Sequence, residues 1–167
     1  VFHEYLMSLA FLPIYRRLFC KFIGEAERII VYNSIQRDLI RKCNSNISVI
    51  PSGVDTELFT PGPFNPARPF TIGLAGRYYE EAKGLRIAIE ACRKLNSEGW
   101  DIQLLVASPG GIESQDKFVK YCGWYDRKNL PGFYNSCNVI LVPSLWEEPF
   151  GIAAVEALSC GIPVIAS

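Results

Sequence analysis

Apolar residues in most of this chain fall in short continuous runs that alternate with amphipathic stretches, which predicts strands and helices in turn. From residue 70 onward the strand-like runs are FTIGLAG, IQLLVAS, FVKYCGW, NVILVPS and PVIAS, and the helical patterns between them are LRIAIEACRKL, NLPGFYNSC and FGIAAVEALSC. The strand-like runs lack a two-residue alternation, which is typical of strands buried on both faces. The pattern therefore predicts an α/β fold, a Rossmann-like parallel sheet with helices on both faces.

A shorter strand-helix-strand pattern precedes this region, formed by RIIVYNS, IQRDLIRKC and NISVIPS. The segment TPGPFNPARP that follows carries four prolines, which favour extended backbone and remove hydrogen-bond donors. We therefore expect one domain at residues 1–59, an interdomain linker at 60–69 and a second domain at 70–167. The chain begins without methionine and ends directly after PVIAS, so we expect it to be an internal piece of a longer protein.

Composition and charge narrow the possible functions. A chain of 167 residues that is 49% hydrophobic and 20% charged can bury a core, so it is not a disordered segment. Its 17 basic and 17 acidic residues cancel, and this balance gives no broad electrostatic footprint for nucleic acid. The six cysteines form no Cys-x-x-Cys motif and the chain has one histidine, which argues against zinc and predicts reduced thiols in a cytosolic protein.

Residues 5–23, YLMSLAFLPIYRRLFCKFI, are the most membrane-like part of the chain. A proline and three basic residues interrupt them, whereas a membrane span needs about 20 apolar residues. Their mixture of aromatic, aliphatic and basic residues is typical of interfacial helices, but a buried helix of the first domain explains it equally well. Peripheral association with the inner face of the membrane therefore stays open.

The loop after the first strand of the second domain, GRYYEEAKG, is a candidate anion site. In an open parallel sheet, ligands bind at the carboxyl ends of the strands. Gly76, Arg77 and Lys83 lie in this loop just before a helix, and two cations beside a helix N-terminus suit a phosphate or pyrophosphate. The alternative is that the cations pair with Glu80 and Glu81 on the surface. A dinucleotide site is disfavoured, because the glycines are not spaced Gly-x-Gly-x-x-Gly.

The loop SLWEEPFG, after the fourth strand, leads into a second candidate site. Pro149 is favourably placed to begin a helix, so the backbone amides of Phe150, Gly151 and Ile152 are expected in its first turn, where helical amides lack intrahelical partners. Gly151 would allow a ligand to approach the backbone closely. These residues extend the predicted site from the first loop to the fourth strand.

Two glutamates, Glu148 and Glu156, flank that helix start. Eight helical residues rise about 12 Å, which is too far for the pair of carboxyls, roughly 5 to 9.5 Å apart, that glycoside hydrolysis uses. The spacing suits two contacts along one extended ligand. The alternative places Glu148 near a helix N-terminus and Glu156 on a solvated face, although Glu156 lies inside an apolar run, where an unpartnered carboxylate is costly.

Three segments resemble the retaining glycosyltransferases of family 4: SVIPSGVDTELFTP, GRYYEEAKG and VPSLWEEPFGIAAVEALSCGIPVIAS. The similarity extends from about residue 27 to the end of the chain. It implies a GT-B fold, in which two Rossmann-like domains face a cleft. The chain would then hold the nucleotide-sugar-binding C-terminal half and a remnant of the N-terminal, acceptor-side domain.

The resemblance also implies roles for single residues. Arg77 and Lys83 would hold the diphosphate of the sugar donor and stabilise the charge that develops as the nucleotide leaves. Glu148 would contact hydroxyls of the donor sugar, Glu156 would accept hydrogen bonds from the ribose, and His3 in VFHEY would face the reacting sugar from the first domain. The implied catalytic residues are Arg77, Lys83, Glu148 and His3. The implied donor-binding residues are Gly76, Arg77, Lys83, Glu148, Phe150, Gly151, Ile152 and Glu156.

The activity implied by the resemblance is transfer of a sugar from a nucleotide-diphosphate sugar to a glycan or lipid-linked acceptor, with retention of configuration. The family works without a bound metal or other cofactor in most members, in the cytoplasm, and nucleic acid is not a partner. We expect this piece of the chain to be inactive alone. A non-catalytic nucleotide-sugar-binding module and a nucleotide-sugar epimerase of the same architecture are the alternatives.

Overall fold

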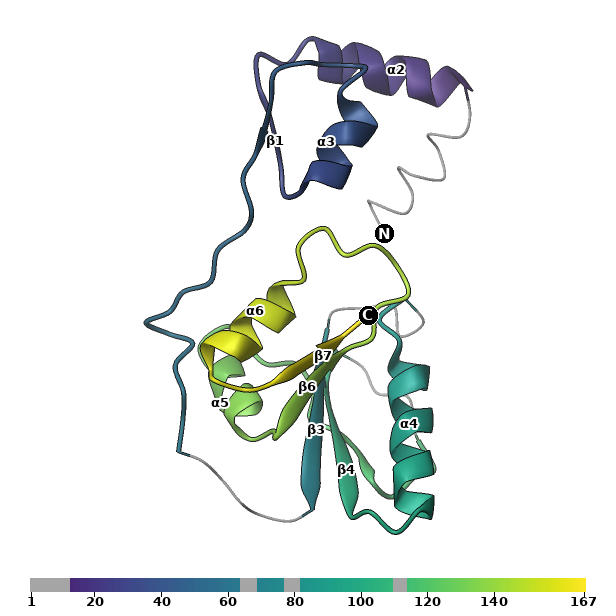
Figure 1. Ribbon diagram of the computed structural model, residues 1–167, viewed down its shortest axis with the longest axis vertical. Coiled ribbons are helices and arrows are strands. Elements are labelled where there is room, and N and C mark those ends of the chain that lie inside the picture. The colour runs from purple at the N-terminus through teal and green to yellow at the C-terminus, as the bar shows by residue number, and fades with distance from the viewer. Residues whose placement is uncertain (1–12, 64–68, 77–81, 110–113) are drawn as a thin grey trace. The chain divides into compact units, whose positions relative to one another are not determined.

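The computed structural model describes residues 13–63, 69–76, 82–109 and 114–167 (Figure 1). The chain divides into two compact units, Val1–Ser52 and Gly53–Ser167.

The first unit contains the predicted strand-helix-strand pattern. Its elements are α2 (Pro13–Gly24), β1 (Ile29–Val31), α3 (Ser34–Ile40) and β2 (Ile47–Val49). The two strands are parallel, with Ile29 opposite Ile47. Asn33 caps α3, since its side chain accepts a hydrogen bond of 2.8 Å from the amide of Gln36. The strand-helix-strand pattern predicted from the sequence is therefore present in this unit.

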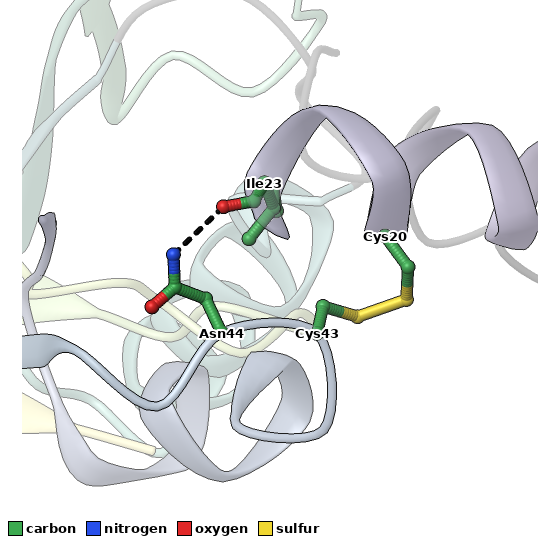
Figure 2. Close-up of a disulfide and its surroundings, with 4 residues drawn as sticks. All are labelled: Cys20, Ile23, Cys43 and Asn44. Carbon is green, nitrogen blue, oxygen red and sulfur yellow. Dashed lines mark hydrogen bonds between the residues drawn. A yellow bond between two sulfur atoms is a disulfide. The ribbon is translucent and has the colours of Figure 1, made fainter. Parts of the chain in front are cut away.

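A disulfide joins α2 to the end of α3 (Figure 2). It connects Cys20 to Cys43, whose Cα atoms lie 4.7 Å apart. Beside it, the side-chain amide of Asn44 donates hydrogen bonds of 2.8 Å to the carbonyls of Ile23 and Ala26. The prediction that all thiols are reduced is therefore wrong for this pair. The two cysteines are 23 residues apart in sequence and meet only because α2 packs near the end of α3, which no local motif reveals.

Of the membrane-like stretch at 5–23, residues 5–12 lie outside the described part, and the rest falls in α2, a helix of 12 residues. Across the described residues, no helix combines the length and the apolar character that a membrane crossing needs.

The second unit is built on a five-stranded parallel sheet with the strand order β5-β4-β3-β6-β7. The strands are β3 (Phe70–Ala75), β4 (Ile102–Ala107), β5 (Val119–Tyr121), β6 (Val139–Val142) and β7 (Val164–Ala166). The helices are α4 (Leu85–Ser97), α5 (Leu130–Asn135) and α6 (Ile152–Ser159). All five predicted strands and all three predicted helices of this region are present, and every strand pairing is parallel.

Helices cover both faces of this sheet, as predicted, and each face has its own apolar cluster (Figure 1). On one face, α4 packs through Leu85, Ala88 and Cys92. On the other, α5 and α6 contribute Phe133, Tyr134, Cys137, Ala157 and Cys160. Within single strands, alternate residues enter opposite clusters: Leu104 joins the α4 side and Ala107 the other. Burial on both faces explains why the strands are continuous apolar runs.

The segment before β3 is attached to the second unit. Phe59 is 1% exposed and lies in the cluster with α5 and α6. Asn135 of α5 accepts a hydrogen bond of 2.8 Å from the amide of Gly62 and donates one of 3.1 Å to the carbonyl of Thr60. The unit boundary thus falls at residue 52, before the predicted linker at 60–69, because Phe59 anchors the chain to the second core. Residues 64–68 of that linker lie outside the described part.

The strand order fixes where a ligand can bind. The chain runs from β3 outward to β4 and β5, then returns to β6 on the other side of β3. The strand order therefore reverses between the neighbouring strands β3 and β6, and the loops that leave their carboxyl ends run in opposite directions. Open α/β sheets bind ligands at such a switch point.

Candidate functional site

The loops that follow β3 and β6 are bound to each other. The amide of Leu145 donates a hydrogen bond of 2.8 Å to the carbonyl of Ala82. Gly84, at the start of α4, has a left-handed backbone with φ of 69°, and a Cβ atom built there would overlap the carbonyl oxygen of Pro143. Glycine is required at this position both for the backbone angle and for the close approach of the two loops. The contact brings the residues of both predicted sites together.

Lys83 and Glu148 form an ion pair across these two loops. The side chains are 27% and 21% exposed, respectively, so the pair is partly accessible to solvent. The structure thus brings together two predicted site residues that are 65 positions apart in sequence. It also shows the partner of Lys83, which the sequence did not predict.

Glu148 receives two further hydrogen bonds at the same oxygen. The Ser144 hydroxyl donates at 2.7 Å and the Trp146 indole N–H donates at 3.1 Å. Burial alone raises the pKa of Glu148, but the hydrogen bonds from Lys83, Ser144 and Trp146 and the charge of Lys83 outweigh it and lower the pKa. Glu148 is therefore a fixed carboxylate at neutral pH.

Trp146 contacts both members of the ion pair. Besides its hydrogen bond to Glu148, its ring lies under the Lys83 ammonium, with Nζ 4.9 Å from the ring centroid. That distance is within the range of a cation–π interaction. Trp146 and Ser144 were part of the loop SLWEEPFG, but nothing in the local pattern assigned them a role.

Glu156 occupies a different environment, on α6. It is 8% exposed, and the Tyr134 hydroxyl donates a hydrogen bond of 2.9 Å to its Oε2 atom. Burial raises the pKa of Glu156, and it does so despite the opposing effects of the Tyr134 hydrogen bond and the Arg127 charge. The alternative that placed Glu156 on a solvated face is wrong. Its partner lies 22 residues earlier, beyond the reach of any local motif.

The start of α6 differs from the prediction. The helix begins at Ile152, with Gly151 as its N-cap in a left-handed conformation at φ 78°, so Pro149 lies in the preceding loop and not at the first helical position. The left-handed turn at Gly151 prevents the helix from extending back to Pro149. The amides of Phe150 and Gly151 therefore belong to the loop, and Ile152 supplies the first amide of the helix.

The remaining predicted residues are placed only in part. The amide of Gly76 donates a hydrogen bond of 3.1 Å to the carbonyl of Ala107, which fixes the start of the loop to β4. His3 and Arg77 lie outside the described residues, as do Glu80 and Glu81, the suggested surface partners. Their predicted roles stay predictions.

The arrangement combines groups that suit a ligand with both an anionic part and hydroxyls. Lys83 supplies a positive charge next to the N-terminus of α4, where an anion is favoured. Glu148 and Glu156 are carboxylates that accept hydrogen bonds from hydroxyl groups. In the described part of the chain, no three histidine, cysteine or acidic side chains are grouped as metal ligands would be.

Comparison with known proteins identifies a family. The model of the family "Glycosyl transferases group 1" matches residues 69–167, more than half of the chain. D-inositol 3-phosphate glycosyltransferase of Arthrobacter sp. (strain FB24) is 31% identical over 173 residues, covering 88% of this chain and 41% of that protein. Phosphatidyl-myo-inositol mannosyltransferase of Mycolicibacterium smegmatis is 29% identical over 157 residues, covering 88% and 40%.

Solved structures show the same fold. HepE of Anabaena in complex with UDP-glucose aligns with a TM-score of 0.76 and 20% identity, covering 92% of this chain and 48% of that one. Sucrose-phosphate synthase of Thermosynechococcus elongatus aligns with a TM-score of 0.74 and 23% identity, covering 92% and 43%. This chain therefore spans about two-fifths of the length of the curated relatives that it matches. Its parallel sheet with helices on both faces is the Rossmann-like sheet of the GT-B fold, and the chain belongs to the group 1 glycosyltransferases.

Proposed function

We propose that this chain carries the donor-binding half of a glycosyltransferase that moves a sugar from a nucleotide-diphosphate sugar to an acceptor with retention of configuration. The observation that carries the proposal is the meeting of Lys83 and Glu148 at the switch point between β3 and β6. Both residues lie inside the region that the family model matches.

The two charges have complementary tasks in this proposal. Lys83 binds the diphosphate, where the N-terminus of α4 adds to the positive potential. Its charge also stabilises the nucleoside diphosphate as it leaves. Glu148, held as a carboxylate by its three hydrogen-bond donors, accepts a hydrogen bond from a hydroxyl of the donor sugar. The sugar and the phosphate are thereby fixed from two loops that are themselves bound together.

Glu156 binds the nucleoside end of the ligand. Its Oε2 atom is already bonded to Tyr134, which fixes the orientation of the carboxylate. A rigid, mostly buried carboxylate is suited to two neighbouring hydroxyls such as those of a ribose, because little side-chain entropy is lost on binding. The backbone amides around Phe150, Gly151 and Ile152 lie between the two glutamates in sequence and contact the sugar and phosphate.

The proposal extends to residues outside the described part by resemblance alone. Arg77 joins Lys83 on the diphosphate, and His3 faces the reacting sugar. With cations in these positions the reaction needs no metal to neutralise the leaving group. The acceptor is a glycan or a lipid-linked molecule, and the reaction takes place in the cytoplasm or at the inner face of the membrane. Support for a lipid-linked acceptor comes from the relative named for phosphatidyl-myo-inositol.

Binding of nucleotides tests the donor site. Isothermal titration calorimetry with UDP, GDP and ADP identifies the base that binds, and the same measurement on Lys83→Ala and Glu156→Ala tests the assigned contacts. We expect each variant to bind the nucleoside diphosphate at least about 10-fold more weakly, since a hydrogen bond to a charged group contributes about 1.5–3 kcal/mol. Lys94→Ala and Glu90→Gln, which change exposed residues of α4, are the matched controls. Wild-type affinity in Lys83→Ala and Glu156→Ala would refute the proposed site.

Turnover separates the proposed activity from its two alternatives. The full-length protein is incubated with the nucleotide sugar that binds, with and without candidate acceptors, and the products are followed by NMR. A transferase consumes the donor in an acceptor-dependent manner and keeps the anomeric configuration. Isomerisation without an acceptor would indicate an epimerase, and binding without any turnover would indicate a non-catalytic module.

A further inference from the structure

Trp146 is the side chain on which the two functional charges of the site meet. Its indole N–H donates a hydrogen bond of 3.1 Å to Glu148, and Lys83 Nζ lies 4.9 Å from the centroid of its ring. We propose that Trp146 is a positioning residue for the sugar donor, which holds Glu148 through its N–H and Lys83 through its ring face. This inference rests on the proposed function, because it assigns a task within the donor site.

Two different interactions arise from one rigid group. An indole has a hydrogen-bond donor at its edge and an electron-rich face, so it can bind a carboxylate and a cation at the same time. Lysine has a long side chain with high rotamer entropy, and contact with a ring face restricts it without occupying its N–H donors. Lys83 can therefore stay in place when its hydrogen bonds are transferred to another anion.

The ion pair implies an exchange when the donor binds. In the structure, the ammonium of Lys83 donates to the Oε1 atom of Glu148. A diphosphate with its multiple negative charges competes for the same ammonium. Glu148 then keeps the hydrogen bonds from Ser144 at 2.7 Å and Trp146 at 3.1 Å, so the carboxylate stays in position after the hydrogen bond of Lys83 is transferred to the phosphate. Without these two neutral donors, Glu148 would follow Lys83 or turn to solvent.

The loop that carries Trp146 is itself supported. Ser167 donates a hydrogen bond of 2.8 Å from its hydroxyl to the carbonyl of Ser144, and the amide of Leu145 is bonded to Ala82 at 2.8 Å. The backbone on the N-terminal side of Trp146 is thus fixed from two directions. A change confined to the indole should leave this backbone in place, which makes the residue suitable for substitution.

The two roles can be separated by substitution. Trp146→Phe keeps a ring face and removes the N–H, whereas Trp146→Leu removes both. The probes are UDP with UDP-glucose, GDP with GDP-mannose and ADP with ADP-glucose. Calorimetry measures the affinity ratio between the nucleotide sugar and the nucleoside diphosphate of the pair that binds. We expect Trp146→Phe to leave the affinity for the nucleoside diphosphate within about 2-fold and to weaken the nucleotide sugar about 5- to 10-fold. Trp146→Leu should weaken both ligands.

Two further variants guard against an effect of misfolding. Ser144→Ala removes another hydrogen bond to the same oxygen of Glu148. Like Trp146→Phe, it should weaken binding of the nucleotide sugar more than binding of the nucleoside diphosphate. Trp100→Phe changes a tryptophan that is 62% exposed and lies between α4 and β4, so it should change neither affinity. Thermal unfolding of each variant shows whether it is folded.

The outcomes distinguish this inference from the proposed function. If the wild type binds one of the probe pairs and Trp146→Phe weakens both ligands equally, or neither, the positioning role is overturned while the donor site stands. If the wild type binds none of the probes, both the donor site and the positioning role are overturned. A selective loss of the nucleotide sugar in Trp146→Phe, with both affinities reduced in Trp146→Leu, is the result that we expect.

Discussion

The two compact units of this chain are stabilised in different ways. The second unit buries apolar side chains on both faces of its sheet, and residues such as Leu104 and Ile140 are 0% exposed. Among residues 17–52 of the first unit, Val31 is the only buried hydrophobic side chain, whereas Phe22 is 70% and Ile30 61% exposed. Apolar burial therefore dominates in the second unit, while the first relies on its Cys20–Cys43 disulfide and on side-chain hydrogen bonds.

The contrast is consistent with the position of the candidate site in the second unit. A ligand site needs side chains whose positions are fixed by packing and by a network of hydrogen bonds. Lys83 and Glu148 stand on loops that leave adjacent strands of the sheet, and Gly84 allows these loops to touch. The first unit offers side-chain hydrogen bonds as well, but those of Asn44 and Asn46 go to backbone carbonyls and hold the unit itself together.

Substitution of Gly84 should have the largest effect on the second unit. Gly84→Ala adds a Cβ atom that overlaps the carbonyl of Pro143, at a backbone angle of φ 69° that disfavours side chains. We expect the free energy of unfolding to fall by about 4 kcal/mol, and nucleotide binding to weaken because the two loops separate. Gly99→Ala is the matched control: its φ is 92°, but no atom lies within 4 Å of the added Cβ, so only the strain of about 1–2 kcal/mol remains. Equal losses in urea unfolding of the two variants would contradict the close loop contact.

Removal of the disulfide should affect the first unit alone. A cross-link between residues 23 positions apart stabilises a fold by about 3 kcal/mol through the entropy of the unfolded chain. In Cys20→Ser, we expect amide hydrogen exchange to accelerate in α2 and α3 and to stay unchanged in β3 and β4. Cys122→Ser changes a free, partly buried cysteine of the second unit and serves as the control. If exchange accelerates equally in both units, their stabilities are coupled and the contrast between them is wrong.

Glu156→Gln should have a smaller and pH-dependent effect. Burial raises the pKa of Glu156, so the folded state binds its proton more tightly than the unfolded state does. The contribution of this group to stability is then fully present below the unfolded pKa of about 4.3 and is lost as the pH rises through the higher folded value. The glutamine side chain of this variant carries no charge and can still accept the Tyr134 hydrogen bond, so we expect its Tm at pH 7 to be higher by about 2–4 °C.

The same variant should weaken nucleotide binding, since the carboxylate is a proposed ligand contact. The effect on stability is tested by calorimetric melting curves between pH 4 and pH 8. Glu90→Gln, which changes an exposed residue of α4, is the control. The Tm advantage of Glu156→Gln should shrink as the pH falls toward 4. A constant difference across this range would show that ionisation of Glu156 is not opposed by the fold.

The sequence predicted the second unit more completely than the first because its elements follow from local patterns. Strands buried on both faces are recognisable as continuous apolar runs, and the loops that leave them include Lys83 and Glu148. The carboxylate of Glu156 was expected to need a partner because it lies in an apolar run. What the sequence could not show is which groups meet: Lys83 with Glu148, 65 residues apart, and Glu156 with Tyr134, 22 residues apart.

Two of the wrong expectations have clear physical reasons. Cys20 and Cys43 are joined only through the packing of α2, so their spacing in sequence contained no signal. The helix start at Pro149 followed from the preference of proline for the first helical turn, but Gly151 adopts a left-handed backbone that begins the helix at Ile152. Tertiary packing decided the first case, and the backbone conformation of Gly151 decided the second.

The central claim is that a nucleotide sugar binds where the loops after β3 and β6 meet. The most direct test is an NMR titration of the 15N-labelled protein with the nucleotide sugar that calorimetry identifies. We predict the largest amide shifts at Gly76, Lys83 and Gly84, at Glu148 and at residues 150–152, with a further shift at Glu156. Shifts concentrated instead at the amino ends of the strands, around Phe70 and Ile102, would contradict the account.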